Sequence, residues 1–132
     1  NPASKEPTLE LALSVVRGQM KFSLPSFTVK PSQRVKITFT NPDEMQHNLV
    51  VIRPGTTEAV GALADAMAKT PDAAERNYIP PTPDVINSTK LIDPQQSVTL
   101  EFVAPRQTGD YPYICTFPGH WRLMQGTMKV SP

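Results

Sequence analysis

The 132-residue chain has a single cysteine, Cys115, and only two histidines, His47 and His120. One cysteine cannot form an internal disulfide bond, so cysteine usage does not indicate an oxidising or a reducing compartment. The net charge is only +1, from 13 basic and 12 acidic residues, and no basic run is suited to neutralising phosphates. This balance gives no electrostatic reason to expect nucleic acid or an anionic membrane as a partner.

The sequence also lacks any hydrophobic run approaching the roughly 20 apolar residues that a membrane-spanning helix requires. Its opening, NPASKEPTLE, has neither the charged nor the apolar region of a signal peptide. We expect either a cytoplasmic protein or a chain from which a leader or a larger parent polypeptide has been removed. Residues 1–8 are polar with two prolines, as is typical of a flexible arm or a linker remnant.

The remaining residues, 9–132, have the length of one ordinary domain and are dominated by alternating apolar side chains. Such alternation predicts strands with one buried face at 9–15, 34–40 and 97–102. Short apolar runs between turn-forming residues predict further strands at 27–30, 47–52, 110–115 and 126–130. Seven or eight short strands indicate an all-β protein, as an antiparallel sandwich or barrel.

One segment, TTEAVGALADAMAK, has helical periodicity. The residues that follow the i, i+3, i+4, i+7 spacing are Val60, Leu63, Ala64 and Met67. Thr56 is the expected N-cap, and Pro71 lies beyond the expected end. Because a proline-rich stretch follows, residues from about 55 to 84 are predicted to form a flap with one short helix.

The segment CTFPGHWRLM, residues 115–124, places a thiol, an imidazole and a thioether within ten residues. Its Pro-Gly pair would break a helix, so we expect a loop between the strands predicted at 110–115 and 126–130. The other histidine starts the strand predicted at 47–52, so both histidines lie at strand ends. If these ends meet at one pole of the sandwich, the candidate ligands there are His47, Cys115, His120 and Met124.

Two imidazoles, one thiolate and one thioether favour copper among biological metals, because a trigonal His₂Cys plane with a weak axial Met is the blue-copper arrangement. A frame that imposes one geometry on both oxidation states makes electron exchange fast, and this set leaves no open position for a substrate. We therefore expect no enzyme. Zinc fits less well, since structural sites use four Cys or His ligands and catalytic sites keep an open position.

Two other interpretations of these residues stay open. Cys115 and His120 could form a nucleophilic pair, but that leaves His47 and Met124 without a role. Each residue, taken singly, could also be an ordinary packed or hydrogen-bonded side chain.

These residues resemble the cupredoxins and, within them, the azurin and auracyanin group. The match to C-T-F-P-G-H-x-x-L-M-x-G is unbroken over residues 115–126, preceded by G-x-Y-x-Y-x-C at 109–115 and M-x-H-N at 45–48. The resemblance covers residues from about 9 to 130 and implies a cupredoxin-type Greek-key β-sandwich of seven to eight strands with a helical flap. It further implies one copper ion per chain, with equatorial ligands His47, Cys115 and His120 and axial ligand Met124.

The resemblance also implies roles for residues beside the ligands. Asn48 would tie the two ligand loops together, and the backbone N–H of Phe117 would donate to the Cys115 sulfur. From the residues alone, Asn48 could equally cap a turn at a strand end. Gln46 stands where azurins have a glycine whose carbonyl faces the metal. Azurins also carry a disulfide bond, which this chain cannot form.

In such proteins the second loop histidine reaches the surface within an apolar docking patch. We expect this patch to contain Met45, Phe117, Pro118, Gly119, Trp121, Arg122 and Leu123. Trp121 and Arg122 are unlike the small residues of azurins, and we hypothesise that Arg122 biases the patch toward an acidic partner. The alternative is an exposed arginine and a packing tryptophan with no role in docking.

The function implied by the resemblance is outer-sphere one-electron transfer between redox proteins, for example cytochromes or a membrane or multidomain oxidoreductase. It implies a monomer without a small-molecule substrate, in the periplasm or another extracytoplasmic place, with a membrane tether through the N-terminal arm as one option. Two alternatives stay open. The protein could bind and deliver copper without an electron partner, or be an electron-transfer module of a larger multidomain oxidoreductase.

Overall fold

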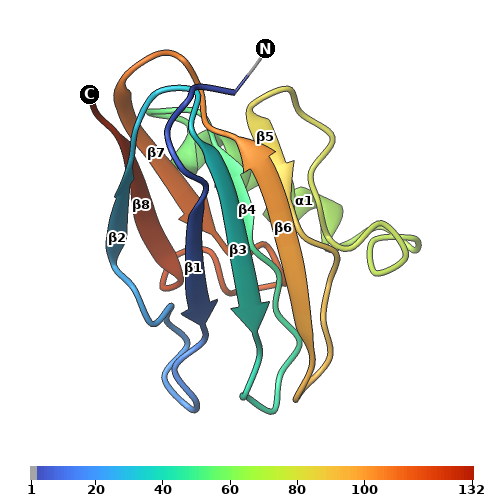
Figure 1. Ribbon diagram of the computed structural model, residues 1–132. Coiled ribbons are helices and arrows are strands. Elements are labelled where there is room, and N and C mark those ends of the chain that lie inside the picture. The colour runs from blue at the N-terminus through green and yellow to red at the C-terminus, as the bar shows by residue number, and fades with distance from the viewer. Residues whose placement is uncertain (1–2) are drawn as a thin grey trace.

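Two packed sheets are built from the strands that alternation predicts, and the computed structural model describes them within residues 3–132 (Figure 1). The strands are β1 Leu9–Ser14, β2 Ser26–Val29, β3 Arg34–Thr40, β4 Val50–Ile52, β5 Val85–Ser88, β6 Ser97–Val103, β7 Gly109–Ile114 and β8 Gln125–Val130, and the helix is α1 Thr57–Met67. One sheet has the order β1-β3-β6, and the other has the order β2-β8-β7-β4-β5. The predicted sandwich of seven to eight strands with one short helix is confirmed.

Two strand pairings are parallel, and here the predicted antiparallel arrangement was wrong. β1 runs parallel to β3, with Leu9 opposite Val35, and β2 runs parallel to β8, with Phe27 opposite Met128. The other four pairings of strands are antiparallel. Parallel neighbours cannot be joined by a tight hairpin, so the chain passes between the sheets from β1 to β2 and back to β3.

The core lies between the sheets and has an aromatic centre. In β3 the alternate residues Val35, Ile37 and Phe39 are all buried. The ring of Tyr113, from the opposite sheet, meets Phe22 edge-on with 5.2 Å between centroids. Its hydroxyl donates to the backbone oxygen of Leu24 at 2.6 Å, so the one polar atom of this ring is satisfied within the core.

The helix α1 covers one face of the five-stranded sheet and buries Val60, Gly61, Ala64 and Met67. Leu63 is 43% exposed, so its predicted place on the buried face was wrong. The ring of Trp121 packs against Gly61, where no side chain intervenes. Thr56 occupies the N-cap position as predicted, but its hydroxyl donates to the Arg53 oxygen at 2.7 Å and makes no cap bond.

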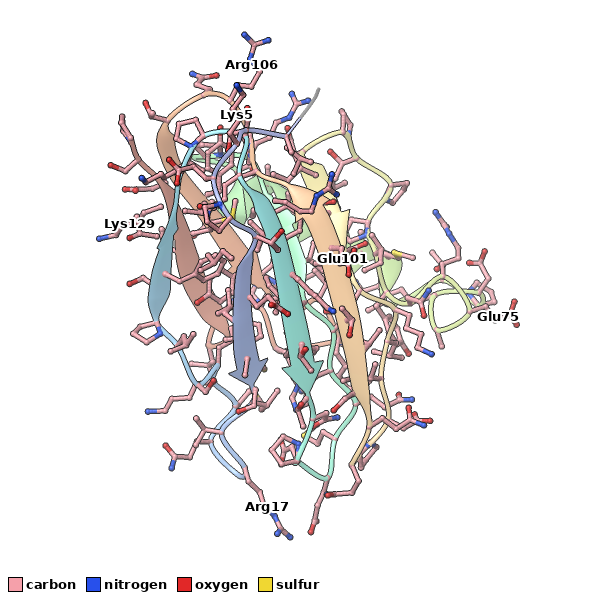
Figure 2. All side chains as sticks on the ribbon, viewed as in Figure 1. Lys5, Arg17, Glu75, Glu101, Arg106 and Lys129 are labelled. Carbon is pink, nitrogen blue, oxygen red and sulfur yellow. The ribbon has the colours of Figure 1, made fainter. Side chains whose placement is uncertain are left out.

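Charged side chains lie around the outside of the sandwich, as the labelled Arg17, Glu101, Arg106 and Lys129 illustrate (Figure 2). In the N-terminal segment the Ser4 N–H donates to the Ser32 oxygen at 2.7 Å. The division into an arm at 1–8 and a domain at 9–132 stays a prediction, and residues 1–2 of that arm lie outside the described residues. Within residues 3–132 no helix has the length and apolar character needed to cross a membrane.

We predict that Gly61→Ala destabilises the protein, although alanine is the better helix former. A Cβ at this position would overlap the indole ring of Trp121, and overpacking of this kind costs about 1–3 kcal/mol. Urea denaturation of the metal-free protein measures the effect. The control is Ala62→Gly on the exposed face of α1, which changes helix propensity alone and costs about 1 kcal/mol. A Gly61→Ala protein more stable than wild type would show that the Trp121 contact does not constrain this position.

Candidate metal centre

The pairing of β4 with β7 brings the two predicted ligand segments together. Val50 lies opposite Ile114, so the residues just before β4 and just after β7 are neighbours. His47 lies three residues before β4, so the strand predicted at 47–52 starts later than expected. His47 instead exchanges two backbone hydrogen bonds with Ile92, at 3.2 and 2.9 Å. These bonds fix its backbone beside Cys115, which directly follows β7.

His47, Cys115 and His120 form a compact cluster of three candidate ligands. The Cys115 Sγ lies 3.7 Å from the His47 Nδ1 and 3.6 Å from the His120 Nδ1. One ligand atom from each residue lies within 4.8 Å of the other two. All three side chains are at most 1% exposed. The structure therefore brings together, from two loops, the three residues predicted for the equatorial plane.

The loop after β7 folds back so that Met124 lies beside Cys115. The His120 N–H donates to the Phe117 oxygen at 3.0 Å, through a turn in which Gly119 has φ of +83°. This left-handed conformation favours glycine. The Met124 N–H donates to the His120 oxygen at 2.9 Å, and the Cys115 N–H approaches the Met124 oxygen at 3.4 Å. The Met124 side chain is fully buried.

The side chain of Asn48 joins the two ligand loops. Its Oδ1 accepts from the Thr116 N–H at 2.8 Å, and its Nδ2 donates to the Thr116 hydroxyl at 2.9 Å. The same Nδ2 donates to the backbone oxygen of Asn77 in the flap at 2.9 Å. The backbone N–H of Asn48 also points to the Cys115 Sγ, at 3.5 Å. One buried amide thus holds the flap and both ligand loops in register.

Burial makes Cys115 a neutral thiol when no metal is bound. Burial raises the pKa of this thiol to about 11, against the opposing effect of backbone N–H groups of Asn48 and Phe117. A nucleophilic cysteine needs a lowered pKa and a ready thiolate. The environment is therefore unsuited to the Cys115–His120 nucleophilic pair, whereas a metal ion that replaces the proton makes the sulfur a ligand.

Asp43 fixes the tautomer of His47 and was missed from the sequence. Its Oδ2 lies 2.9 Å from the His47 Nε2, and this hydrogen bond lowers the pKa of the Asp43 carboxyl despite its burial. An ionised carboxylate only accepts, so the proton lies on Nε2 and the lone pair of Nδ1 faces the Cys115 sulfur. The available signal was an acidic residue four positions before the histidine, in DEMQH.

The His120 imidazole is buried and neutral. Burial lowers its pKa to about 4, and the nearby His47 lowers it further while Asp43 acts in the opposite sense. Two neutral imidazoles and one thiol that a metal can deprotonate suit copper, and the adjacent thioether of Met124 completes a His₂CysMet set. The residues present therefore fit the metal that the sequence pattern predicts.

His120 does not reach the surface, so that expectation from the resemblance was wrong. Its side chain is 1% exposed, and the Phe117 ring lies over it with 4.8 Å between centroids. Tyr78 from the flap then meets Phe117 edge-on at 5.4 Å. Near this cover, Met45 is 43% exposed and Leu123 is 67% exposed.

Trp121 does not line the predicted docking patch. It is buried, and its Nε1 donates to the Asp65 Oδ1 at 3.1 Å. Arg122 donates to the other oxygen of Asp65 at 2.9 Å and lies 4.5 Å from the centroid of the Trp121 ring. Its charge is thus paired with α1, and its surroundings match the packing alternative more closely. Gln46 donates from Nε2 to the Asp93 Oδ1 at 2.7 Å.

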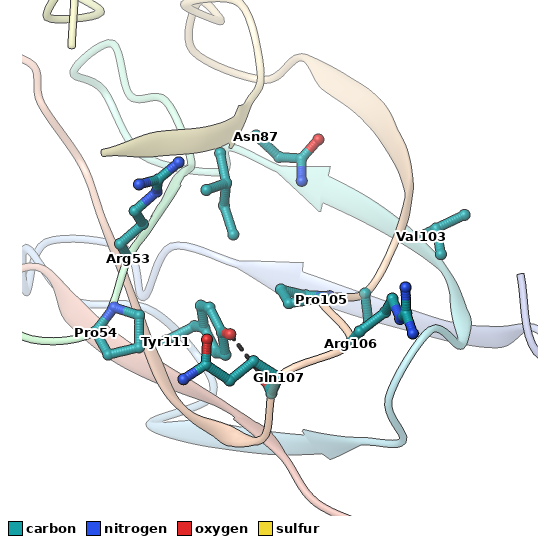
Figure 3. Close-up of a pocket in the computed structure, with 10 residues that line it drawn as sticks. Arg53, Pro54, Asn87, Val103, Pro105, Arg106, Gln107 and Tyr111 are labelled. Atoms are coloured by element: carbon teal, nitrogen blue, oxygen red, sulfur yellow. Dashed lines mark hydrogen bonds between the residues drawn. The ribbon is translucent and has the colours of Figure 1, made fainter. Parts of the chain in front are cut away.

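A hollow of about 680 Å³ lies away from this cluster, at the other end of β7 (Figure 3). Its labelled lining includes Arg53, Asn87, Arg106 and Tyr111, and none of the four candidate ligands contributes to it. The metal cluster itself is closed by packed side chains.

A family model for copper binding proteins, plastocyanin/azurin family, matches residues 9–131. The chain belongs to this family. It is 34% identical over 115 residues to auracyanin A of Chloroflexus aurantiacus, covering 86% of this chain and 68% of that protein. It is 30% identical over 120 residues to an azurin of Pseudomonas aeruginosa, covering 86% of this chain and 79% of that one.

Structure comparison agrees with the family assignment. The solved structure of auracyanin A, described as a "blue" copper protein, superimposes with a TM-score of 0.83 at 32% identity, over 95% of this chain and all of that one. Outer membrane protein H.8 of Neisseria gonorrhoeae is 38% identical over 100 residues, which cover 73% of this chain and 51% of that protein. Together with the His-Cys-His-Met arrangement, this membership makes the chain a blue copper electron-transfer protein of cupredoxin fold.

We predict that the metal-free protein loses stability as the pH falls from about 6.5 to about 4. The folded His120 has a pKa of about 4, whereas the unfolded residue titrates near 6.5. The unfolded chain therefore binds more protons in this range, and the stability from His120 is present above pH 6.5 and lost on acidification. The two pKa values imply a loss of about 3 kcal/mol.

Urea denaturation at a series of pH values measures this loss, and His120→Gln should flatten the dependence. An NMR titration of the metal-free protein in which His120 protonates near its usual pKa would contradict the prediction.

Proposed function

We propose that His47, Cys115 and His120 bind one copper ion in a plane, with Met124 on its axis. The observation that carries the proposal is the buried cluster in which both Nδ1 atoms face one sulfur within 3.7 Å. Copper, when bound there, changes between Cu(I) and Cu(II) and so carries one electron. The chain's own contribution is to hold the ligands in one arrangement for both states.

The surroundings of the ligands support this role. The Asn48 amide ties both ligand loops, and the isolated bridge to Ile92 holds the His47 backbone. Burial excludes water from the donor atoms, and a fixed donor set limits the rearrangement that accompanies a change of charge. Gln46, bonded to Asp93, and Phe117, stacked on His120, complete the shell around the site.

Burial also favours the electron carrier over the two alternatives. Handing a metal ion to another protein requires accessible ligands, and all four here are at most 1% exposed. We propose that the protein catalyses no reaction of its own, because the thiol is neutral and the donors leave no space for a substrate. The chain covers 68% of auracyanin A and 56% of auracyanin B, so further domains and their partners belong to this proposal.

We propose that partner proteins dock on an apolar patch formed by Met45, Phe117, Pro118, Gly119 and Leu123. Met45 and Leu123 are its most exposed large side chains, and Phe117 connects the patch to His120. Small apolar contacts suit weak, quickly exchanging redox complexes. The partners would be redox proteins, with this chain acting as a monomer.

We further propose an extracytoplasmic location. One relative is named an outer membrane protein, and azurins and auracyanins are its other relatives. β1 starts at the end of the sandwich opposite the ligand loops (Figure 1). A tether through the segment before β1 would therefore leave the apolar patch free for partners.

We predict that metal-free protein titrated with Cu(II) develops an intense blue thiolate-to-copper absorption band that saturates at one equivalent. Cys115→Ser removes the thiolate and should abolish the band, whereas the fold persists because the two side chains have similar size. Visible absorption and electron paramagnetic resonance measure the outcome. Cu(II) bound without a blue band, or a preference for Zn(II), would rule out the proposed ligand set.

We predict that Leu123→Glu slows electron self-exchange at least about tenfold, equivalent to ~1.4 kcal/mol, because two docked copies would bring like charges together. The blue band and the potential should stay unchanged. NMR line broadening in mixtures of reduced and oxidised protein gives the rate. The matched control is Leu63→Glu, an exposed leucine on α1 outside the patch. Equal rates in both variants would exclude the patch as the docking surface.

A further inference from the structure

Asp43 is an acidic residue in an unusual environment. The chain has 12 acidic residues, and Asp43 is only 8% exposed. Buried carboxylates are rare unless they are paired. This one is paired with the Nε2 of His47 at 2.9 Å, on the side of the ring opposite the sulfur. The pair connects the outer edge of the proposed copper site to the loop that follows β3.

The carboxylate is held from several sides. Its Oδ1 accepts from the Gly18 N–H at 3.2 Å, in the turn after β1. The Asp43 N–H donates to the Asn41 Oδ1 at 3.0 Å, and the Asn41 Nδ2 donates to the Met45 oxygen at 2.8 Å. Both carboxylate oxygens therefore have a defined donor, and the loop from Asn41 to His47 is closed by its own side chains. Such a carboxylate can orient an imidazole with little freedom.

We propose that Asp43 is a positioning residue of the copper centre that holds the proton of His47 on Nε2 and favours Cu(II) over Cu(I). This inference rests on the proposed ligand role of His47. A hydrogen-bonded carboxylate makes the imidazole a more electron-rich donor through Nδ1, and its negative charge lies in a buried region of low dielectric. Both effects stabilise the more highly charged copper ion and lower the reduction potential.

A purely structural role makes a different prediction. If Asp43 only linked the turn at Gly18 to the ligand loop, its charge would not affect the balance between Cu(I) and Cu(II). A variant that keeps the shape of the side chain and removes the charge separates these cases. Asp43→Asn is that variant, because its amide can still accept from His47 through one oxygen.

In the copper-loaded Asp43→Asn protein we expect a blue band at one equivalent and a raised reduction potential. Cu(II) affinity should fall about 10- to 100-fold, as is usual when an outer partner of a metal ligand is removed. Cu(I) affinity should fall less. Each tenfold difference between the two losses corresponds to about 59 mV for a one-electron couple.

The matched control is Glu44→Gln, which removes the same charge from the neighbouring residue. Glu44 is exposed and pairs with Arg17 at 3.2 Å, so solvent screens its charge. Its potential should stay close to that of the wild type. Equal shifts in the two variants would overturn the inference, because they would reflect net charge alone.

A second measurement uses the metal-free protein and needs no copper. Nitrogen NMR should show the Nε2–H tautomer of His47 in the wild type and a mixture of tautomers in Asp43→Ala. The same tautomer ratio in both would overturn the positioning role, even if Asp43→Asn failed to fold.

The two proposals fail in distinguishable ways. A normal blue band with equal potentials in wild type and Asp43→Asn would overturn the role of Asp43 and leave the ligand set intact. A wild-type protein without a blue band would overturn the ligand set and this inference with it.

Discussion

The register between β4 and β7 determines where the metal centre forms. With Val50 opposite Ile114, the chain before β4 and the chain after β7 must leave the sheet side by side. A shift of one residue would turn every side chain to the opposite face and separate the donors. The Asn48 amide maintains this alignment, since it bonds Thr116 through both its oxygen and its nitrogen. Every other feature of the site depends on this pairing.

The site consists of groups that are neutral before the metal arrives. Burial raises the pKa of the Cys115 thiol and lowers that of the His120 imidazole, so both side chains avoid charge in a dry environment. Asp43 is the exception, and it is offset by hydrogen bonds from His47 and Gly18. Closed, neutral and cross-linked surroundings suit an ion that changes its charge and stays in place.

Much of the fold could be predicted because one-face burial leaves a direct pattern in the residues. The bounds of β3 follow from RVKITFT without knowledge of its neighbours. The parallel pairing of β1 and β3 could not be predicted, since alternation records which side chains are buried and not which strand lies alongside. Leu63 fits the helical period, yet the sheet beneath α1 contacts Val60 and Ala64 and leaves Leu63 exposed.

The ligand loop could be predicted from spacing because its residues are close in the chain, in CTFPGHWRLM. The surroundings of these ligands depend on contacts between distant segments. Trp121 is buried only because Gly61 leaves space for its ring, and His120 is covered through Phe117 and Tyr78. Asp43 acts on His47 through a loop conformation that no periodicity reveals.

The parallel pairing of β2 with β8 has a consequence for how the chain matures during synthesis. Phe27 has to wait for Met128 before its strand gains a neighbour in the sheet, so the five-stranded sheet closes late. Such long-range pairings form slowly. Cys115, His120 and Met124 emerge from the ribosome shortly before β8. The thiol is thus translated last among reactive groups and passes quickly into a closed core, which limits the time in which stray metal ions or oxidants reach it.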